Sequence, residues 1–199
     1  MERKDIEQLT FPYKGHFTTD EGAKVYFTYQ GRLENDKLLF SATTNERENI
    51  IIKFTKRYSE NAHRHCSGQG AAPRLYAFNA LPGGWFMVVM ENLSSSHKLV
   101  HQHDQISSEM SDALQKAVGI LHDGNFVHGD IRDVNLMVPE EGGVGNFMIL
   151  DFDWAGFEGE VRYPAYVNIV GVSRPKGAID GELITKQHDL DMLDRIIHR

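Results

Sequence analysis

The sequence has few of the features that mark secreted, membrane-spanning or disulfide-stabilised proteins. Cys66 is the one cysteine in 199 residues, which excludes an internal disulfide framework and favours a reducing compartment. No run of about 18 apolar residues is present, so a membrane span is not expected. The first five residues are not followed by the apolar region of a secretory signal. We therefore expect a cytoplasmic or nuclear protein that is not secreted.

Positive charge is also scarce. The chain has 21 Lys and Arg residues against 28 Asp and Glu residues, which gives a formal net charge of −7. This balance supplies no electrostatic basis for nucleic acid as the main ligand. The hydrophobic content of 41% and the charged content of 25% are ordinary for a globular protein. The length suits one domain with a sizeable core, or two small lobes around a cleft.

The order of predicted elements indicates an α+β fold. Three early runs are rich in aromatic and β-branched residues and predict an antiparallel meander, and a later pair of runs across Pro82-Gly83-Gly84 predicts a hairpin. Three segments have helical patterns, of which the first has Ser59 as a possible N-cap. The predicted strands are 24–30, 38–43, 49–55, 74–78 and 85–90, and the predicted helices are 58–66, 107–122 and 184–197.

Two short stretches, residues 127–138 and 147–154, place polar side chains beside apolar runs. Residues 136–138 and 147–150 are predicted to be buried strands, and residues 139–146 are predicted to form the turn between them. Such a hairpin puts Asn135 at the start of one strand and Asp151 at the end of the other. The two side chains would then lie side by side, with Asp130 arriving from the preceding loop.

This cluster contains the groups that phosphoryl transfer needs. Asp130 can accept the proton of an attacking hydroxyl, and Arg132 is placed to hold the transferring phosphate. Asn135 and Asp151 offer the oxygen ligands that Mg²⁺ takes on nucleotide phosphates. The alternative is that Asp130, Asn135 and Asp151 only cap turns.

The first stretch resembles the catalytic loop of the protein-kinase-like superfamily, in which Asn follows the Asp of His-Arg-Asp by five residues. The glycine of His128-Gly129-Asp130 is typical of aminoglycoside phosphotransferases, choline kinases and several compact atypical protein kinases. Asp151-Phe152-Asp153 is similar to their Asp-Phe-Gly motif, and compact fungal-type kinase-like proteins often have Asp-Phe-Asp-Trp here. The resemblance implies a bilobal fold, with an antiparallel-sheet N-lobe over residues 1–93 and a truncated helical C-lobe over residues 94–199.

The resemblance also implies a set of nucleotide-binding residues. Lys53 matches the strand lysine that contacts the nucleotide phosphates, and Glu60 the helix glutamate that pairs with it. The hinge that binds the adenine edge would be residues 90–93, with Met90, Glu91 and Leu93. From the residues alone, Lys53 could equally reach solvent, Glu60 could favour a helix N-terminus, and the hinge could be a plain strand end.

Other segments are assigned more loosely. Residues 94–103 are expected to be a solvated linker in spite of three histidines, and residues 155–177 are expected to form an activation and substrate-binding segment. Asp189 resembles the buried helix aspartate that braces the kinase catalytic loop, although a solvated position is an alternative. Only Gly31 lies where kinases carry a glycine-rich loop, and Asp130 lacks the preceding arginine that receives a phosphorylated activation loop.

We therefore expect an ATP- and Mg²⁺-dependent phosphotransferase, most specifically a small atypical Ser/Thr protein kinase. The alternatives are a pseudokinase that acts as a nucleotide- or protein-binding module, and a small-molecule phosphotransferase. The expected partners are ATP and a protein or small hydroxyl-bearing acceptor. A protein partner or self-association is also expected at the last helix, where an apolar stripe is predicted to include Leu190, Leu193 and Ile197.

Overall fold

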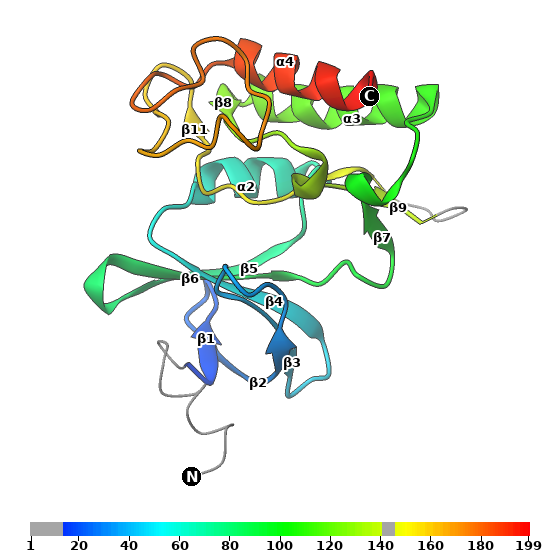
Figure 1. Cartoon of the computed structure of the whole chain (residues 1–199). Helices are drawn as coiled ribbons and strands as arrows, with labels where there is room; N and C mark the ends of the chain where they lie inside the picture. The colour runs from blue at the N-terminus through cyan, green and yellow to red at the C-terminus, as the bar shows by residue number, and fades with distance from the viewer. Residues whose placement is uncertain (1–13, 141–145) are drawn as a thin grey trace. The chain divides into compact units, whose positions relative to one another are not determined.

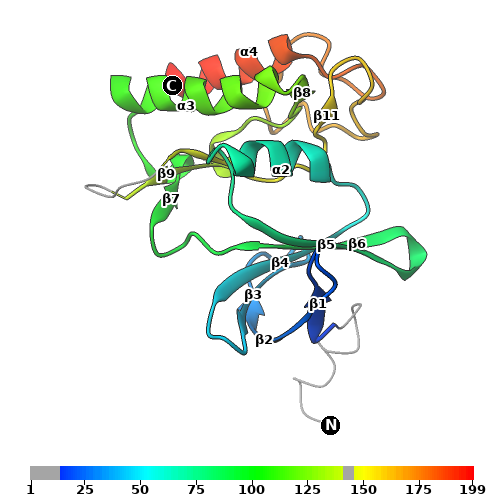
Figure 2. The same ribbon diagram turned by 180° about the vertical axis from the view of Figure 1, so that it is seen from behind.

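The structure is a computed structural model that describes residues 14–140 and 146–199. The chain groups into two compact units, whose elements are labelled in Figure 1 and, seen from behind, in Figure 2. The first unit contains the described residues up to Phe54 together with Tyr76–Glu91. The second contains Thr55–Leu75 and Asn92–Arg199. The predicted division into lobes at residue 93 stays a prediction.

The first unit is built on a six-stranded sheet with the strand order β1-β2-β3-β4-β6-β5. Neighbouring strands from β1 to β4 pair antiparallel, which confirms the predicted meander. A break in register between Tyr29 and Gly31 marks a bulge in β2. The strands are β1 His16–Thr18, β2 Lys24–Arg32, β3 Leu39–Thr44, β4 Asn49–Thr55, β5 Leu75–Leu81 and β6 Trp85–Glu91.

Strand β4 lies between β3 and β6 in this sheet, which explains its nearly continuous apolar run. Ile50 and Ile52 are fully buried, and each such side chain contributes about 1.5–3 kcal/mol when it leaves water. The hairpin between β5 and β6 turns through η1 Pro82–Gly84, where Gly83 and Gly84 both have positive φ values. The core of this sheet contains Phe17, Phe27, Ala42, Ile50, Ile52, Phe54, Ala77, Met87 and Val89.

Among its described residues, the second unit contains three helices and two small sheets. The helices are α2 Glu60–Gly68, α3 Ser108–Asp123 and α4 Lys186–Ile197, and α3 and α4 lie side by side (Figure 1). One sheet has the order β10-β9-β7, with β7 His97–Leu99, β9 Leu136–Pro139 and β10 Met148–Ile149. The other pairs β8 Phe126–Val127 with β11 Gly156–Phe157. Two short 3₁₀ turns, η2 Val100–Gln102 and η3 Asp133–Asn135, complete the unit.

All three helices begin where side-chain hydroxyls can accept hydrogen bonds from their first turns. Ser59, Ser107 and Thr185 are the N-caps, and they accept from the backbone N–H groups of Ala62, Met110 and His188. Each cap of this kind contributes about 1 kcal/mol. At the two ends of α2, the Ser59 N–H donates to the Phe152 carbonyl and the Ala71 carbonyl accepts from the Ile149 N–H. These bonds connect α2 to the strand–loop segment that carries Asp151.

Two expectations for this unit are wrong. The segment expected to be a solvated linker contains β7, which pairs with β9, and His97 and Val100 are buried. On α4 the buried face consists of Asp189, Met192, Leu193 and Ile196, whereas Leu190 is exposed. Ile196 packs into the core that α3 also lines, so less apolar surface is left on α4 than the predicted stripe implied. Self-association at this helix stays a prediction.

A membrane-crossing helix needs about 20 largely apolar residues. Over residues 14–140 and 146–199, none of the helices combines that length with that apolar character.

Candidate active site

The loop between β8 and β9 carries the central residues of the site. The predicted hairpin that follows it is confirmed, because Met148 pairs with Met137 and Ile149 with Leu136 in antiparallel register. Of the predicted turn, residues 141–145 lie outside the described residues. The Leu150 N–H donates to the Asn135 carbonyl at 2.8 Å, which brings the residue before Asp151 against the start of β9. Asn135 and the Asp151 segment are therefore neighbours, as the sequence predicts.

Asp189 on α4 holds the backbone at the start of this loop. Its carboxylate is fully buried and accepts the His128 N–H at 2.7 Å and the Gly129 N–H at 2.8 Å. The His122 Nε2 lies 3.1 Å from the same carboxylate. The prediction that Asp189 is buried and braces the backbone of the loop that begins at His128 is confirmed, and the alternative of a solvated position is wrong. Hydrogen bonds to a buried carboxylate are among the stronger ones in proteins, so the loop has a firm anchor.

The conformation of this loop explains the glycine of His128-Gly129-Asp130. Gly129 has a φ of +79°, and a Cβ there would lie 2.6 Å from the Ile184 Cδ1. His128 adds a second constraint, since its Nδ1 accepts the Asp130 N–H at 3.2 Å and its Nε2 lies 2.9 Å from the Leu150 carbonyl. A carbonyl only accepts, so Nε2 carries a proton and donates to it.

Asp130 is the residue on which the polar side chains converge. It is buried to 8% exposure, and its Oδ2 accepts from Arg132 Nη2 at 2.9 Å and from Asn135 Nδ2 at 3.0 Å. Asn135 Nδ2 also donates to the Asp130 backbone carbonyl at 2.9 Å. Three of the sequence-predicted residues are thus joined within hydrogen-bonding distance. The Arg132 Nε is buried without an acceptor among the described residues, which is a donor that a phosphate oxygen would satisfy.

The orientation of the Asn135 side chain suits a metal ligand. Both acceptors of its Nδ2 are oxygens of Asp130, so the amide nitrogen must face Asp130 and the Oδ1 must face the other way. Asp151, on the neighbouring segment, has a φ of +62°, a strained conformation that clusters at functional sites. An amide oxygen and a carboxylate are the hard ligands that Mg²⁺ takes, so the donor set fits this ion. Clusters of three or more His, Cys, Asp or Glu residues able to bind a metal are not found over residues 14–140 and 146–199.

Phe152, the residue after Asp151, is held by stacked rings. It is fully buried, and its ring lies parallel to that of His63 at a centroid distance of 4.8 Å. His63 Nε2 donates to the Pro73 carbonyl at 2.8 Å, so its Nδ1 accepts the Tyr58 hydroxyl at 2.7 Å. Burial and the carboxylates of Asp153 and Asp151 raise the pKa of Tyr58 well above its ordinary value, which keeps this hydroxyl a donor. The backbone of Asp151 is thus fixed from the side of α2.

The residues predicted to bind the nucleotide are distributed over both units. Lys53 is buried to 6% exposure on β4, where it pairs with Leu39 of β3. Met90 and Glu91 end β6, and Leu93 follows in the second unit. Glu60 stands in the first turn of α2 and accepts from Arg64 Nε at 2.8 Å. The pairing of Glu60 with Lys53 and the hinge role of residues 90–93 stay predictions.

One residue of the site is not predicted from the sequence. Arg174 lies in the predicted substrate-binding segment, and its Nη2 donates to Asp130 Oδ1 at 2.8 Å. Its guanidinium carbon also lies 4.8 Å from the centroid of the Trp154 ring. The separation of 44 residues between Arg174 and Asp130 gives no local pattern. The signal available was an arginine within the glycine- and proline-rich segment 155–177.

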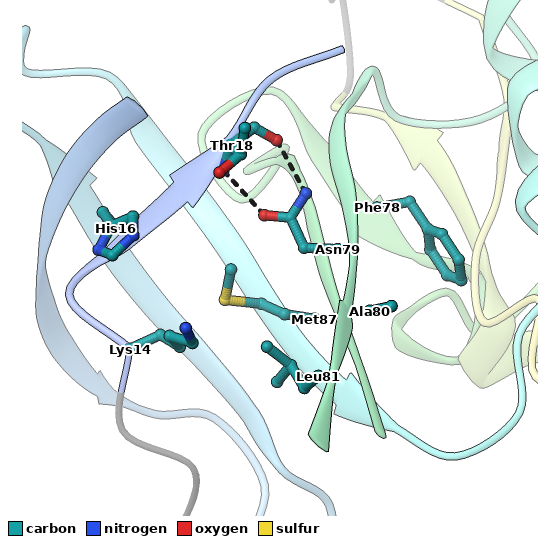
Figure 3. A pocket seen from close by; sticks show the side chains of 8 residues that line it. All are labelled: Lys14, His16, Thr18, Phe78, Asn79, Ala80, Leu81 and Met87. Atoms are coloured by element: carbon teal, nitrogen blue, oxygen red, sulfur yellow. Dashed lines mark hydrogen bonds between the residues drawn. The ribbon is translucent and has the colours of Figure 1, made fainter. Parts of the chain in front are cut away.

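A cavity of about 310 Å³ lies in the first unit, lined by β1, β5 and β6. Thr18 and Asn79 face each other there and exchange two hydrogen bonds of 2.8 Å (Figure 3). None of the predicted site residues is among its lining residues, which are Lys14, His16, Thr18, Phe78, Asn79, Ala80, Leu81 and Met87. The backbone N–H and carbonyl of Thr18 and the side-chain amide of Asn79 satisfy each other in these two bonds.

Two solved structures share the fold of this chain. The kinase PK-1 of Cydia pomonella granulovirus is similar with a TM-score of 0.68, over 86% of this chain and 67% of the viral protein, at 15% sequence identity. Vaccinia related kinase 3 is similar with a TM-score of 0.61, over 96% of this chain and 69% of that protein, at 16% identity. The sequence matches no protein-family model and no curated protein. The chain therefore has a protein-kinase-like fold, with the mixed α/β organisation and antiparallel sheet that the sequence predicts.

Proposed function

We propose that the protein is an ATP- and Mg²⁺-dependent phosphotransferase, and in its finer form a small atypical Ser/Thr protein kinase of the cytoplasm or nucleus. The two compact units would be the two lobes of a kinase-like domain. The observation that supports the proposal most directly is the arrangement of Asp130, Arg132 and Asn135, joined by hydrogen bonds of 2.9–3.0 Å beside the Asp151 segment.

In this proposal Asp130 accepts the proton of the acceptor hydroxyl. Its Oδ1 has one hydrogen-bond donor among the described residues, which leaves a lone pair for that hydroxyl. As the hydroxyl oxygen bonds to the γ-phosphorus, the bond from that phosphorus to the bridging oxygen breaks, and ADP leaves with the electron pair. Arg132 stabilises the negative charge on the transferring group. Asn135 and Asp151 would hold Mg²⁺, which when bound neutralises charge on the phosphates.

The nucleotide contacts are the least direct part of the proposal. Lys53 would contact the α- and β-phosphates, Glu60 would orient Lys53, and Met90, Glu91 and Leu93 would bind the adenine edge. The low exposure of Lys53 argues against the alternative that its side chain reaches solvent. The acceptor would be a protein hydroxyl, with a small hydroxyl-bearing molecule as the alternative.

A second candidate function is a pseudokinase that binds a nucleotide or protein without useful turnover. The observation that favours it is the hairpin formed by β2 and β3, in which Gly31 near the end of β2 is the single glycine where kinases have a glycine-rich loop over the phosphates. The two candidates differ in whether bound ATP transfers its γ-phosphate.

The test is thermal unfolding with ATP in the presence and absence of Mg²⁺, followed by a phosphotransfer assay. A ligand present at about 100 times its Kd stabilises the folded state by about 2.7 kcal/mol. Because we expect Mg²⁺ to tighten ATP binding, ATP with Mg²⁺ should raise the Tm further than ATP alone. We expect Asp151→Asn to lose the part of this rise in Tm that depends on Mg²⁺. Asp133→Asn, on η3 and paired with Arg199, is the control that should keep it. Equal Mg²⁺-dependent shifts in Asp151→Asn and the parent would contradict the metal assignment, whereas binding without transfer would favour the pseudokinase.

A further inference from the structure

Arg174 is a charged side chain in an unusual environment. Its side chain is only 3% exposed, although it belongs to a segment that otherwise exposes much of its surface. A buried guanidinium is costly unless it is paired and hydrogen-bonded. Here it is both, because three of its nitrogens have oxygen acceptors and its central carbon lies over the Trp154 ring, 4.8 Å from the centroid. The burial is therefore compensated, which points to a fixed role.

The contacts of Arg174 join three separate parts of the chain. Nη2 donates to Asp130 Oδ1 at 2.8 Å, and Nη1 donates to the Gly129 carbonyl at 3.3 Å. Nε donates to the Asn168 carbonyl at 3.1 Å. Trp154 supplies the aromatic face from the segment that follows Asp151. One side chain thus connects the catalytic loop, the Asp151 segment and the residues near Asn168.

The segment around Asn168 is organised by two further side chains. The Asp180 carboxylate accepts the N–H groups of Tyr166 and Val167, at 2.7 and 2.8 Å. These hydrogen bonds lower the pKa of Asp180. Asn168 Oδ1 accepts the N–H groups of Val170 and Gly171. Residues 166–180 therefore form a folded loop, and Arg174 is its attachment to Asp130.

We infer that Arg174 is a positioning residue that locks the loop 166–180 onto the catalytic loop and fixes the orientation of the Asp130 carboxylate. The inference rests on the proposed function. Arg132 and Asn135 occupy Asp130 Oδ2, and Arg174 occupies one lone pair of Oδ1, so the carboxylate cannot rotate and its remaining lone pair has one direction. The group that attaches loop 166–180 is Arg174, which belongs to the loop itself. The loop can therefore be ordered without a phosphate group added to the chain.

The experiment compares Arg174→Ala and Arg174→Lys with the parent, and uses Lys176→Ala as the charge-matched control. Lys176 is exposed in the same loop, two positions further on. Hydrogen–deuterium exchange by mass spectrometry measures the order of residues 166–174 in unphosphorylated protein, and steady-state kinetics measure kcat and KM for ATP.

We expect faster exchange over residues 166–174 in Arg174→Ala. We also expect a fall in kcat of about 100-fold with little change in the KM for ATP, because misplaced catalytic groups cost about that factor. Arg174→Lys keeps the charge but cannot reach three acceptors, so it should be intermediate. Lys176→Ala should match the parent in the exchange measurement, because Lys176 is exposed in the same loop.

Unchanged exchange in Arg174→Ala, or a rise in its kcat, would overturn the inference, since a rise would mean that Arg174 blocks Asp130. If Arg174→Ala does not fold, Arg174→Lys takes its place. Exchange over residues 166–174 that is no faster in Arg174→Lys than in Lys176→Ala, or a kcat above that of the parent, would then overturn the inference. A parent protein without any phosphotransfer would refute the proposed function alone, because the exchange measurement would still establish or reject the attachment of the loop.

Discussion

Gly129, next to Asp130, and Asp151, two residues after β10, both have left-handed backbone conformations. Their φ values are +79° and +62°. An aspartate tolerates this region better than most residues, and the hydrogen bonds on either side of it fix its position. Glycine has no such penalty, but the space beside Gly129 is tight because the Ile184 Cδ1 would lie only 2.6 Å from a Cβ. The left-handed conformation of Gly129 shapes the loop that carries Asp130, and that of Asp151 shapes the segment after β10.

Gly129→Ala should therefore destabilise the protein through two separable effects. An alanine in the left-handed region costs roughly 1–2 kcal/mol, and the 2.6 Å approach to Ile184 Cδ1 adds overpacking of about 1–3 kcal/mol. Gly159→Ala is the matched control, since Gly159 has a φ of +87° and no atom would lie within 4 Å of a Cβ added there. Urea unfolding should show the larger loss for Gly129→Ala, and equal losses would contradict the role of the Ile184 contact.

At the residue scale, the sequence predicts the members of the site that lie close to one another along the chain. Asp130, Arg132 and Asn135 lie within one loop, so their mutual hydrogen bonds follow from a short motif. Arg174 could not be found in this way, because its contact with Asp130 depends on the path of the chain through Asn168 and Asp180. The glycine of His128-Gly129-Asp130 is visible in the sequence, but its physical reason requires the position of Ile184.

At the element scale, α4 supports the loop between β8 and β9 that carries Asp130. The helix begins after Thr185 and places Asp189 in its first turn, where the fully buried carboxylate accepts two backbone N–H groups of the loop. The helix packs through Met192, Leu193 and Ile196 into the core that α3 also lines. Burial of this face thus sets the position of Asp189, and Asp189 sets the position of His128 and Gly129.

We expect Asp189→Asn to weaken this support more than its small change in volume suggests. The two loop N–H groups point at opposite carboxylate oxygens, so an asparagine must turn its own NH₂ group toward one of them. A buried donor without an acceptor costs about 1–3 kcal/mol. Asp194→Asn, exposed on the same helix, is the control that should lose much less. Thermal or urea unfolding measures both variants, and similar losses would mean that Asp189 does not brace the loop.

The sequence predicts the elements with a strong periodic pattern, but not those that depend on distant partners. The meander β2–β4, the helices α2 and α3 and the hairpin β9–β10 have their signals in the local sequence. Strand β7 is only three residues long and exists because β9 pairs with it, so no local pattern marks it. On α4, Leu190 and Ile196 both fit an apolar face, and only the position of the core decides which of them is buried.

At the scale of the whole molecule, the second unit buries several groups that titrate at alkaline pH. Burial raises the pKa of the Cys66 thiol to about 12, and the side chain is fully buried in α2. Burial and nearby carboxylates also raise the pKa values of Tyr58 and Tyr163 above the ordinary range. All three groups are therefore neutral in the folded protein well beyond the pH at which they would ionise in the unfolded chain.

This difference predicts a loss of stability at alkaline pH. Above about pH 9 the unfolded chain releases these protons while the folded protein keeps them, so the free energy of unfolding falls as the pH rises. Below the ordinary pKa of a thiol the contribution is fully present. A full difference of one proton changes the free energy of unfolding by about 1.4 kcal/mol per pH unit, so Cys66 should account for on the order of 1 kcal/mol between pH 8 and pH 10.

Urea unfolding of the parent and of Cys66→Ala at pH 7, 8, 9 and 10 separates the titration of the thiol from its packing. The alanine leaves a small cavity and lowers stability at every pH by a similar amount, but it removes one titrating group. Its free energy of unfolding should therefore fall less steeply between pH 8 and pH 10 than that of the parent. Ser67→Ala, the next residue in α2, changes the helix without removing the thiol and should follow the slope of the parent. Parallel curves for Cys66→Ala and the parent would mean that the thiol ionises equally in both states and that the alkaline loss comes from the tyrosines alone.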